Sequence, residues 1–326
     1  MPNYQGVWSL STQYQNASGW PFPLPSSIGL FYGGFASGSI TNTIEYIDLT
    51  TSGNTTDFGD MLELQRLNAA FGSTSRGVVG GGAAASGIGN NVIQFVTFST
   101  LGNASDFGDL TETRSYIAGT SNNTRGLFAG GYNTSAASSD TIDYVTIASA
   151  GNASDFGNLT VAKSAASSLA SPTRAITSGG YNFGVGSYYN VIEYVTIGST
   201  GNGTDFGDLL SALFSNASAS SSTRGVIAGG ENHTETPRYK DIIQYITIAS
   251  TGNATDFGDL TVGKSYLTAT SSNTIAVFGG GLNNVQNYNN IDQVTIASTG
   301  NATDFGDLSA AHAQFAASSN CHGGVQ

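Results

Sequence analysis

The tripeptide Asp-Phe-Gly occurs six times along the chain at nearly constant intervals. Successive copies are 49, 49, 50, 51 and 48 residues apart, and a Gly-Asn pair precedes each one. A self-similar period of about fifty residues indicates a repeat architecture, in which each unit buries its apolar face against its neighbours. We therefore expect the 326 residues to form one large repeat domain. The copies begin at Asp57, Asp106, Asp155, Asp205, Asp256 and Asp304.

Each repeat contains four segments with the length and composition of β-strands. The first is made of small residues (163–170), the second is apolar and ends in Gly-Gly (125–131), and the third is rich in β-branched and aromatic residues (142–147). The fourth contains Asp-Phe-Gly, whose invariant Phe is expected to pack between neighbouring units. Four short strands in a repeat of about fifty residues are typical of a β-propeller blade. The sequence predicts an all-β fold, a single six-bladed propeller with four-stranded antiparallel blades.

The two ends of the repeat region complement each other. The first unit lacks its first segment, and a spare first segment follows the last unit at about 311–318. We expect this C-terminal strand to complete the first blade, a one-plus-three closure that leaves no open seam. The propeller is thus predicted to span 28–326. Residues 1–27 lie outside the repeat, hold both tryptophans and four of the six prolines, and are predicted to form an extended N-terminal arm.

Composition and charge exclude several classes of partner. The formal net charge is −12 with only ten Lys and Arg residues, which argues against nucleic acid because phosphate neutralisation needs cations. No apolar run approaches the roughly 18 residues of a membrane span, so no membrane insertion is expected. No basic segment followed by an apolar core indicates a secretory signal. The single cysteine, Cys321, excludes an internal disulfide framework and has no metal-ligand spacing.

Enzymatic propellers are disfavoured by the residues that they would need. A galactose-oxidase-like enzyme needs copper ligands and a Cys–Tyr crosslink, but the chain has three histidines and one cysteine close to its end. Sialidases carry Ser-x-Asp-x-Gly-x-Thr-Trp boxes, which Ser-Asp-Phe-Gly-Asp-Leu does not match. No nucleophile motif or phosphate-binding loop is present. We predict a non-enzymatic protein without catalytic residues, cofactor or metal.

Polar residues that recur in every repeat are assigned to the fold. The basic and acidic or amide residues at repeated positions are expected to make hydrogen bonds and ion pairs between blades. The Gly-Asn pairs fit turns better than glycosylation sites, because Asn tolerates left-handed backbone and bonds its own backbone. The paired Asp residues of each copy fit capping of the outer turn better than calcium binding. The recurring residues are Glu45, Gln94, Asp143, Glu193, Gln244 and Asp292, then Arg66, Arg114, Lys163 and Lys264, and then Arg76, Arg125, Arg174 and Arg224.

Candidate binding residues lie where the repeats diverge. The loops between the second and third segments vary most, and insertions confined to one face of a repeat protein usually mark its binding face. The fourth and fifth loops combine aromatic, Asn and charged side chains, which suit contacts with a sugar or a protein. The alternative is drift tolerated by a stable scaffold. The candidates are Tyr181, Phe183, Tyr188 and Tyr189 in the fourth loop and His233, Arg238 and Tyr239 in the fifth.

The repeat resembles the kelch repeat, with an apolar strand ending in Gly-Gly, a variable loop, an aromatic-bearing strand and an aromatic in the outer strand. It departs from kelch in having Phe where that outer aromatic is normally Trp. The variant Tyr-Val-Thr-Ile-Ala-Ser-x-Gly-Asn-Ala-x-Asp-Phe-Gly-Asp-Leu resembles propeller repeats of tailed-bacteriophage virion proteins, and the segment 6–21 is similar to N-terminal segments of phage tail-fibre-like proteins.

This resemblance implies a structural protein of the phage tail or fibre apparatus, assembled in the host cytoplasm and located in the virion. The arm, with Trp8, Tyr14 and Trp20, would dock to other virion proteins, and the propeller loops would contact a host-surface glycan or protein, or neighbouring proteins. One alternative is a capsid decoration or cement protein, which contacts only virion proteins. Another is a free kelch-type lectin or adaptor, which has no need of an arm.

Overall fold

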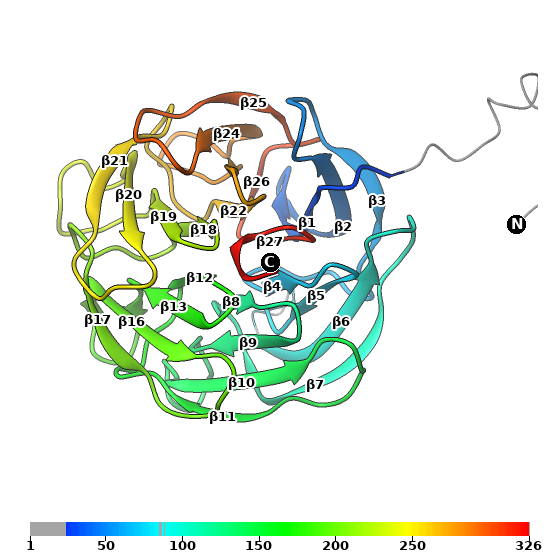
Figure 1. Cartoon of the computed structure of the whole chain (residues 1–326), viewed down its shortest axis with the longest axis horizontal. Helices are drawn as coiled ribbons and strands as arrows, with labels where there is room; N and C mark the ends of the chain where they lie inside the picture. Colours follow the sequence, from blue (N-terminus) through cyan, green and yellow to red (C-terminus); the bar gives the residue numbers. More distant parts are fainter. Residues whose placement is uncertain (1–23, 85–86, 88, 326) are drawn as a thin grey trace, which may run out of the picture.

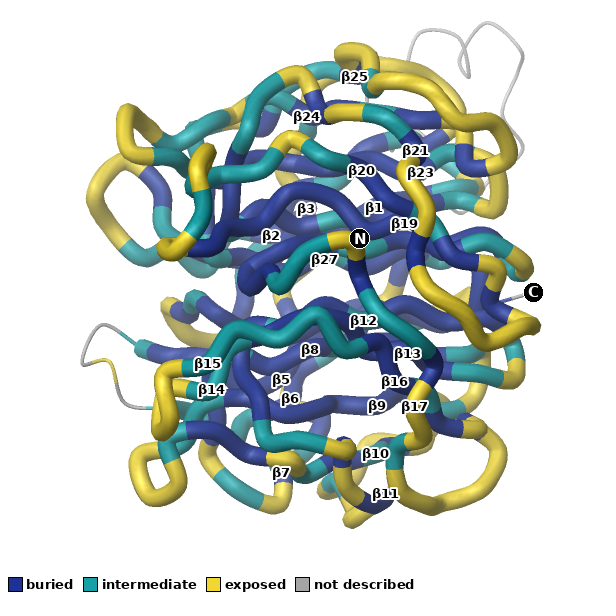
Figure 2. Tube along the Cα trace, turned by 90° about the vertical axis from the view of Figure 1, so that its left-hand side faces the viewer, coloured by how far each residue is buried: buried dark blue, intermediate teal, exposed yellow. Residues whose placement is uncertain are grey.

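Six antiparallel sheets surround a central axis as the blades of a propeller (Figure 1). This computed structural model describes residues 24–84, 87 and 89–325 of the chain. Each blade begins with a short inner strand beside the axis and ends with an outer strand at the rim. The all-β, six-bladed fold that the repeat predicts is confirmed. Buried residues follow the strands, and exposed residues concentrate in the loops at both ends of the blades (Figure 2).

The first three blades follow one another along the chain, and strands near the C-terminus of the chain complete the first of them. Blade 1 consists of β1 (Ile28–Ala36), β2 (Ser39–Asp48) and β3 (Thr56–Asp60), with β26 (His312–Ala313) and β27 (Ala316–Ser319) on the inner side. Blade 2 consists of β4 (Ala69–Gly72), β5 (Arg76–Gly80), β6 (Asn90–Thr97) and β7 (Ser105–Arg114). Blade 3 consists of β8 (Ala118–Ser121), β9 (Arg125–Ala129), β10 (Thr141–Thr146) and β11 (Ser154–Asn158).

The other three blades repeat the same order of strands. Blade 4 consists of β12 (Ser167–Ala170), β13 (Arg174–Ser178), β16 (Val191–Thr196) and β17 (Thr204–Asp208), and carries a hairpin of β14 (Tyr181–Asn182) and β15 (Ser187–Tyr188). Blade 5 consists of β18 (Ala217–Ser220), β19 (Arg224–Ala228), β20 (Ile242–Thr247) and β21 (Thr255–Asp259). Blade 6 consists of β22 (Thr268–Ser271), β23 (Ile275–Gly279), β24 (Asn290–Thr295) and β25 (Thr303–Asp307), and the short 3-10 helix η2 (Gly323–Val325) follows β27.

The ring closes between the two ends of the repeat region. Strand β27 pairs antiparallel with β1, with Leu30 opposite Ser318, and β26 extends this pairing to Ala36 opposite His312. The predicted one-plus-three closure by the C-terminal strand is therefore confirmed. It gives β1 an inner neighbour and removes the unpaired edge that an open ring would leave.

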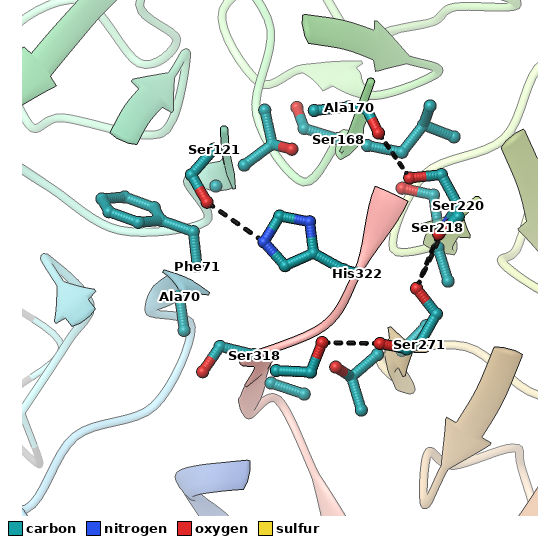
Figure 3. A pocket seen from close by; sticks show the side chains of 18 residues that line it. Ala70, Phe71, Ser121, Ser168, Ala170, Ser218, Ser220, Ser271, Ser318 and His322 are labelled. Carbon is teal, nitrogen blue, oxygen red and sulfur yellow. Dashed lines mark hydrogen bonds between the residues drawn. The ribbon is translucent and has the colours of Figure 1, made fainter. Parts of the chain in front are cut away.

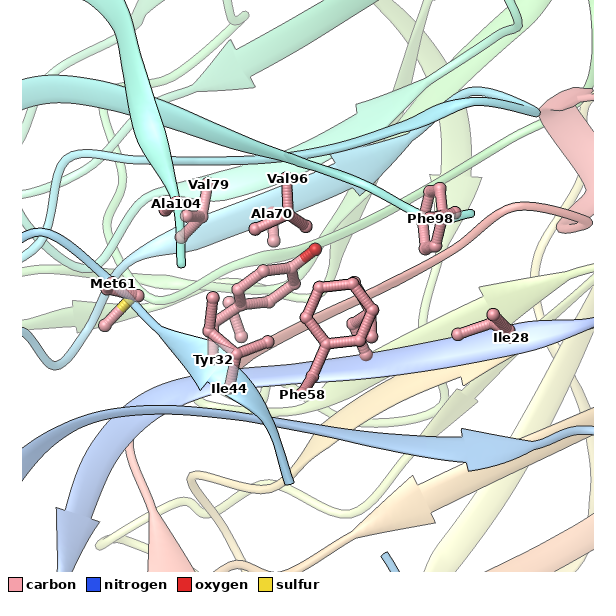
Figure 4. Packing of buried hydrophobic residues seen from close by; sticks show 12 residues of the cluster. Ile28, Tyr32, Ile44, Phe58, Met61, Ala70, Val79, Val96, Phe98 and Ala104 are labelled. Carbon is pink, nitrogen blue, oxygen red and sulfur yellow. The ribbon is translucent and has the colours of Figure 1, made fainter. Parts of the chain in front are cut away.

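The Phe of each Asp-Phe-Gly packs between two blades, as predicted. Phe58 lies 2% exposed in a cluster that joins Tyr32 and Ile44 of blade 1 to Val96 and Phe98 of blade 2 (Figure 4). The aromatic residue of the third strand meets it edge-on in five blades, for example Tyr46 with ring centroids 6.2 Å apart. Because each hydrophobic cluster spans two blades, the core runs around the ring.

The Gly-Asn pairs hold neighbouring blades together, which corrects the expectation that Asn bonds its own turn. The Asn103 side-chain oxygen accepts the Asp60 N–H of the preceding blade at 3.0 Å, and the Ala104 N–H donates to the Asp60 carbonyl at 2.8 Å. The Asn bond recurs at all six junctions. These contacts cover part of each outer edge and use only the backbone at the position of Asp60, so Asn158 replaces the Asp in the third copy without loss.

Four arginines at the start of the second strand tie each of their blades to the next, as predicted. The guanidinium of Arg76 lies over the Phe95 ring at 4.5 Å and donates to the Ile147 carbonyl of the following blade at 2.9 Å. Cation–π and charge-assisted hydrogen bonds are thus combined at one inter-blade contact. The same arrangement is made by Arg125, Arg174 and Arg224.

Buried polar pairs form a second series, in which the segment leading into each blade meets the third strand of that blade. Lys163 Nζ lies 2.6 Å from Glu193 Oε1, and both side chains are almost fully buried. Arg114 pairs with Asp143 in the same way. The position before blade 2 is occupied by Gln65 rather than by Arg66, which corrects the predicted alignment by one residue. The five pairs are Gln65 with Gln94, Arg114 with Asp143, Lys163 with Glu193, Lys264 with Asp292 and His312 with Glu45, and in blade 5 the equivalent positions hold Leu213 and Gln244.

Charge is matched within this series. Every acidic residue of the series has a basic or titratable partner, whereas Gln94 meets the uncharged Gln65, and Gln244 occurs in the blade whose equivalent position holds the uncharged Leu213. A buried charge without a partner is strongly destabilising, so a blade that loses its cation is expected to lose its anion too.

Candidate functional site

One face of the propeller carries the variable loops. The loops between the second and third strands leave the blades on the same side as the connections from each outer strand to the next inner strand, and we call this side the loop face. The β14–β15 hairpin lies on it, and the C-terminus lies on the opposite side (Figure 2). The loop face therefore presents the segments in which the six repeats differ most.

Exposed apolar side chains gather on the loop face. Of the seven large hydrophobic residues that are exposed in the described part of the chain, six lie there, and Val185 is 70% exposed. On the opposite face, only Leu101 is of this kind. A face that carries exposed apolar side chains is a candidate contact surface. The six are Leu62, Leu64, Phe183, Val185, Leu210 and Val285.

Eight rings on the loop face form a continuous network, which we call the aromatic cluster. Phe183 contacts Tyr116 and Tyr181 with centroids 5.4 and 5.0 Å apart, and Tyr181 also contacts Phe214 at 5.6 Å. Tilted and edge-on contacts of this kind hold the rings in fixed orientations. The cluster consists of Tyr116, Tyr132, Tyr181, Phe183, Tyr188, Phe214, His233 and Tyr266.

The sequence identified half of this cluster. The predicted candidates Tyr181, Phe183, Tyr188 and His233 belong to it. Tyr116, Tyr132, Phe214 and Tyr266 were missed, and three of these four lie just before an inner strand, in segments assigned to small residues. They could have been found as departures from the small residues at the same positions of other blades.

The remaining predicted candidates lie outside the cluster. Tyr189 donates its backbone N–H to the Gly180 carbonyl at 2.9 Å, and the Tyr239 hydroxyl donates to the Asn284 side chain of blade 6 at 3.0 Å. Arg238 lies over the Tyr239 ring at 4.9 Å. The arm residues Trp8, Tyr14 and Trp20 lie outside the residues that the structure describes.

The cations of the fifth loop are already neutralised by carboxylates. Buried Glu231 accepts from Arg238 Nε at 2.6 Å and lies 3.0 Å from His233 Nε2. Lys240 pairs with Glu235 at 2.8 Å. These contacts position the loop, and they leave Arg238 and Lys240 poorly suited to bind an anionic ligand.

Six residues in left-handed backbone conformation close a hydrogen-bonded ring around the axis on the loop face. Each N–H donates to the carbonyl of its counterpart in the preceding blade at 2.7–3.0 Å, and the last bond returns to the first residue. We call this the mouth ring. Because the shared property is a backbone bond, the side chains are free to differ. The members are Leu67, Tyr116, Ala165, Ser215, Tyr266 and Gln314.

A hollow at the mouth ring leads towards the channel between the inner strands. Tyr116 and Tyr266 contact each other beside it at 6.4 Å, and Gln314 lies on its rim. Burial raises the pKa of both tyrosines, so their hydroxyls stay protonated and neutral at neutral pH. The hollow combines aromatic walls with hydroxyl and amide groups, as small-ligand sites do.

The opposite mouth holds a serine–histidine contact that is not built for catalysis. His322 Nε2 lies 3.3 Å from Ser121 Oγ (Figure 3). Its Nδ1 accepts the Gly324 N–H at 3.1 Å, so the ring proton resides on Nε2 and is donated to the Gly72 carbonyl at 3.0 Å. The Ser121 hydroxyl also donates to Gly72, at 2.6 Å. The nitrogen next to Ser121 therefore cannot accept its proton, and this pair is no activated nucleophile.

No protein-family model and no curated protein sequence matches the chain. Within the described residues, no group of three or more His, Cys, Asp or Glu side chains is placed to hold a metal ion. No helix in that part of the chain is long and apolar enough to cross a membrane.

Proposed function

We propose that this protein is a non-enzymatic structural component of a tailed-bacteriophage virion, part of the tail or fibre apparatus. In this proposal the N-terminal arm docks the protein to other virion proteins. The loop face of the propeller contacts the host surface or a neighbouring protein. The observation that carries the binding role is the concentration of exposed apolar and aromatic side chains on one face of an otherwise regular ring.

The asymmetry of the aromatic cluster supports this role. Contacts that serve the ring recur in most or all blades, as the Asn and Arg contacts between blades do. Phe183 and Phe214 have no aromatic counterpart at most equivalent positions, yet they are held by several neighbouring rings. Aromatic side chains fixed in this way supply contact area at little entropic cost on binding. The virion assignment rests on the resemblance of the repeat and of the N-terminal segment.

The first test compares host binding by variants of the two faces. Phe183→Ser combined with Val185→Ser removes apolar area from the loop face, and Leu101→Ser makes a similar change on the opposite face. Labelled full-length protein is measured for binding to host cells, to a glycan array and to purified virion proteins. We expect the loop-face variant to lose host or glycan binding by about tenfold or more, and Leu101→Ser to behave like the parent protein.

The same assay separates attachment from decoration. A chain lacking residues 1–23 should lose capture of virion proteins and retain host binding. If the full chain captures only virion proteins and no variant of the loop face changes any interaction, the propeller is particle architecture and the host-attachment role is wrong.

A further inference from the structure

We infer that the hollow at the mouth ring binds an acidic sugar, namely a saccharide that carries a single carboxylate and is otherwise uncharged. Arg66 is the group that binds the carboxylate. This inference rests on the proposed role of the loop face and specifies its ligand. Three observations carry it: the pairing state of every cation in the chain, the way in which Arg66 is held, and the asymmetry of the mouth.

Arg66 is the one cation on the loop face that lacks a carboxylate partner. All ten Lys and Arg residues lie in the described part of the chain. Four arginines bond carbonyls on the opposite face, three cations form the buried pairs at the entrances of the blades, and Arg238 and Lys240 pair with glutamates. No Asp or Glu of the described residues pairs with Arg66, and none of the residues outside them is an Asp or Glu.

The Arg66 guanidinium is held in place by neutral groups. Its NH1 donates to the Gln314 side-chain oxygen at 2.9 Å, and its charge lies 5.9 Å from the Phe35 ring centroid. The Nε atom is buried without a hydrogen-bond partner. A planar guanidinium that is fixed on one side by neutral groups and has no carboxylate partner is suited to pair with a carboxylate through its remaining N–H groups. Gln314 links this group to the hollow, because it also lies on the rim.

The mouth is asymmetric in the manner of a ligand site. The residues equivalent to Arg66 in the other blades are Ser115, Ser164, Phe214, Ser265 and Ala313. Arg66 and Gln314 therefore stand on one side of the mouth, and Phe214 belongs to the aromatic cluster on the other side. Between them Tyr116 and Tyr266 line the hollow, with their ring centroids 6.4 Å apart and their hydroxyls neutral. Ring faces pack on the apolar side of a sugar, and hydroxyl and amide groups bond its hydroxyls.

The charge of the whole protein narrows the ligand further. A net charge of −12 repels a polyanion at long range. One carboxylate among neutral sugars keeps the short-range pairing with Arg66 and avoids most of this repulsion. A ligand with a single acidic group is therefore favoured over a polyuronate.

The test is a titration of the full chain with four probes. These are a glucuronate-terminated trisaccharide, its methyl ester, the matching glucose-terminated trisaccharide and glucose 6-phosphate. We expect the acid to bind the parent protein about tenfold or more tightly than its ester. Arg66→Gln should bring this ratio close to one. Lys240→Gln, which removes a paired cation from the same face, should leave the ratio unchanged. Tyr266→Ala should weaken the binding of the acid and of the ester to the same extent.

Several results would overturn the inference. These are equal binding of acid and ester, an unchanged preference in a folded Arg66→Gln variant, binding of the phosphate but not of the carboxylate, or no binding of the acid at about 10 mM. Thermal unfolding of each variant confirms that it is folded. If the protein binds host cells or the neutral trisaccharide but does not prefer the acid, only the proposed acidic ligand is wrong, and the proposed function stands. If cells, glycans and virion proteins all fail to bind, the proposed function fails as well.

Discussion

Single residues of the repeat are fixed by the close approach of neighbouring blades. Gly59 has φ of +152°, and a Cβ at this position would overlap the carbonyl oxygen of Gly102 in the next blade. The equivalent glycine of every Asp-Phe-Gly faces the backbone of the following Gly-Asn pair in the same way. The invariant glycine is thus explained by a contact between blades as well as by its own backbone conformation.

We predict that Gly59→Ala lowers the free energy of unfolding by about 3 kcal/mol, because it adds overlap to an unfavourable backbone conformation. Gly53→Ala is the matched control. Gly53 belongs to the Gly-Asn pair of blade 1, and a Cβ there would meet no atom within 4 Å. Urea unfolding of both variants measures the difference. Similar stabilities of the two variants would show that the approach between blades does not require glycine.

At the scale of strands and their junctions, the sequence predicted those features for which the same residue types recur at equivalent positions of the repeats. Six Phe residues, six Gly-Gly-terminated strands, four of them with an arginine at the start, and a spare inner strand were sufficient for the fold. The mouth ring could not be predicted, because Leu67, Ala165 and Gln314 have nothing in common except a backbone hydrogen bond. The same limit explains the misplacement of Arg66, since residue type alone aligned it with the buried cations.

The matched pairs at the entrances of the blades provide a second prediction. Lys163 lies fully buried against Glu193, and burial lowers the pKa of Lys163, an effect that the carboxylate partly offsets. Lys163→Leu leaves Glu193 charged and buried, and is expected to cost about 3 kcal/mol of stability. The double variant Lys163→Leu/Glu193→Gln reproduces the Leu213 and Gln244 pair of blade 5, whose amide accepts a backbone N–H at 2.9 Å.

We expect the double variant to recover most of the stability that the single variant loses. Thermal or urea unfolding of the parent, both single variants and the double variant forms a double-mutant cycle. Additive losses in the double variant would mean that charge matching within the pair does not govern these positions.

The channel of the whole molecule is bordered by the mouth ring on the loop face and by the C-terminal segment on the other. His322 reaches the Gly72 carbonyl of blade 2 and lies beside Ser121 of blade 3. A Cβ at Gly324 would overlap the Ser121 carbonyl, and one at Gly323 would overlap the Ser221 carbonyl of blade 5. The segment after β27 therefore contacts several blades at once, and its state bears on the stability of the ring.

This contact predicts a pH dependence. Burial lowers the pKa of His322 from 6.5 to about 4, so the folded protein holds it neutral where the unfolded chain is protonated. Because the unfolded state then binds the extra proton, stability is complete above pH 6.5 and is lost as the pH falls to about 4. The loss amounts to about 3 kcal/mol. His322→Gln keeps a donor for the Gly72 carbonyl and removes the titration.

The measurement is urea unfolding of the parent and of His322→Gln between pH 7.5 and about 4, with the difference between the two proteins taken at each pH. Titration of the carboxylates is common to both proteins and cancels in this difference. The parent should lose about 3 kcal/mol more than the variant across the window, with little change above pH 6.5. Parallel curves would mean that the folded protein does not hold His322 neutral in this pH range, and the contacts of His322 with blades 2 and 3 would then be absent in solution.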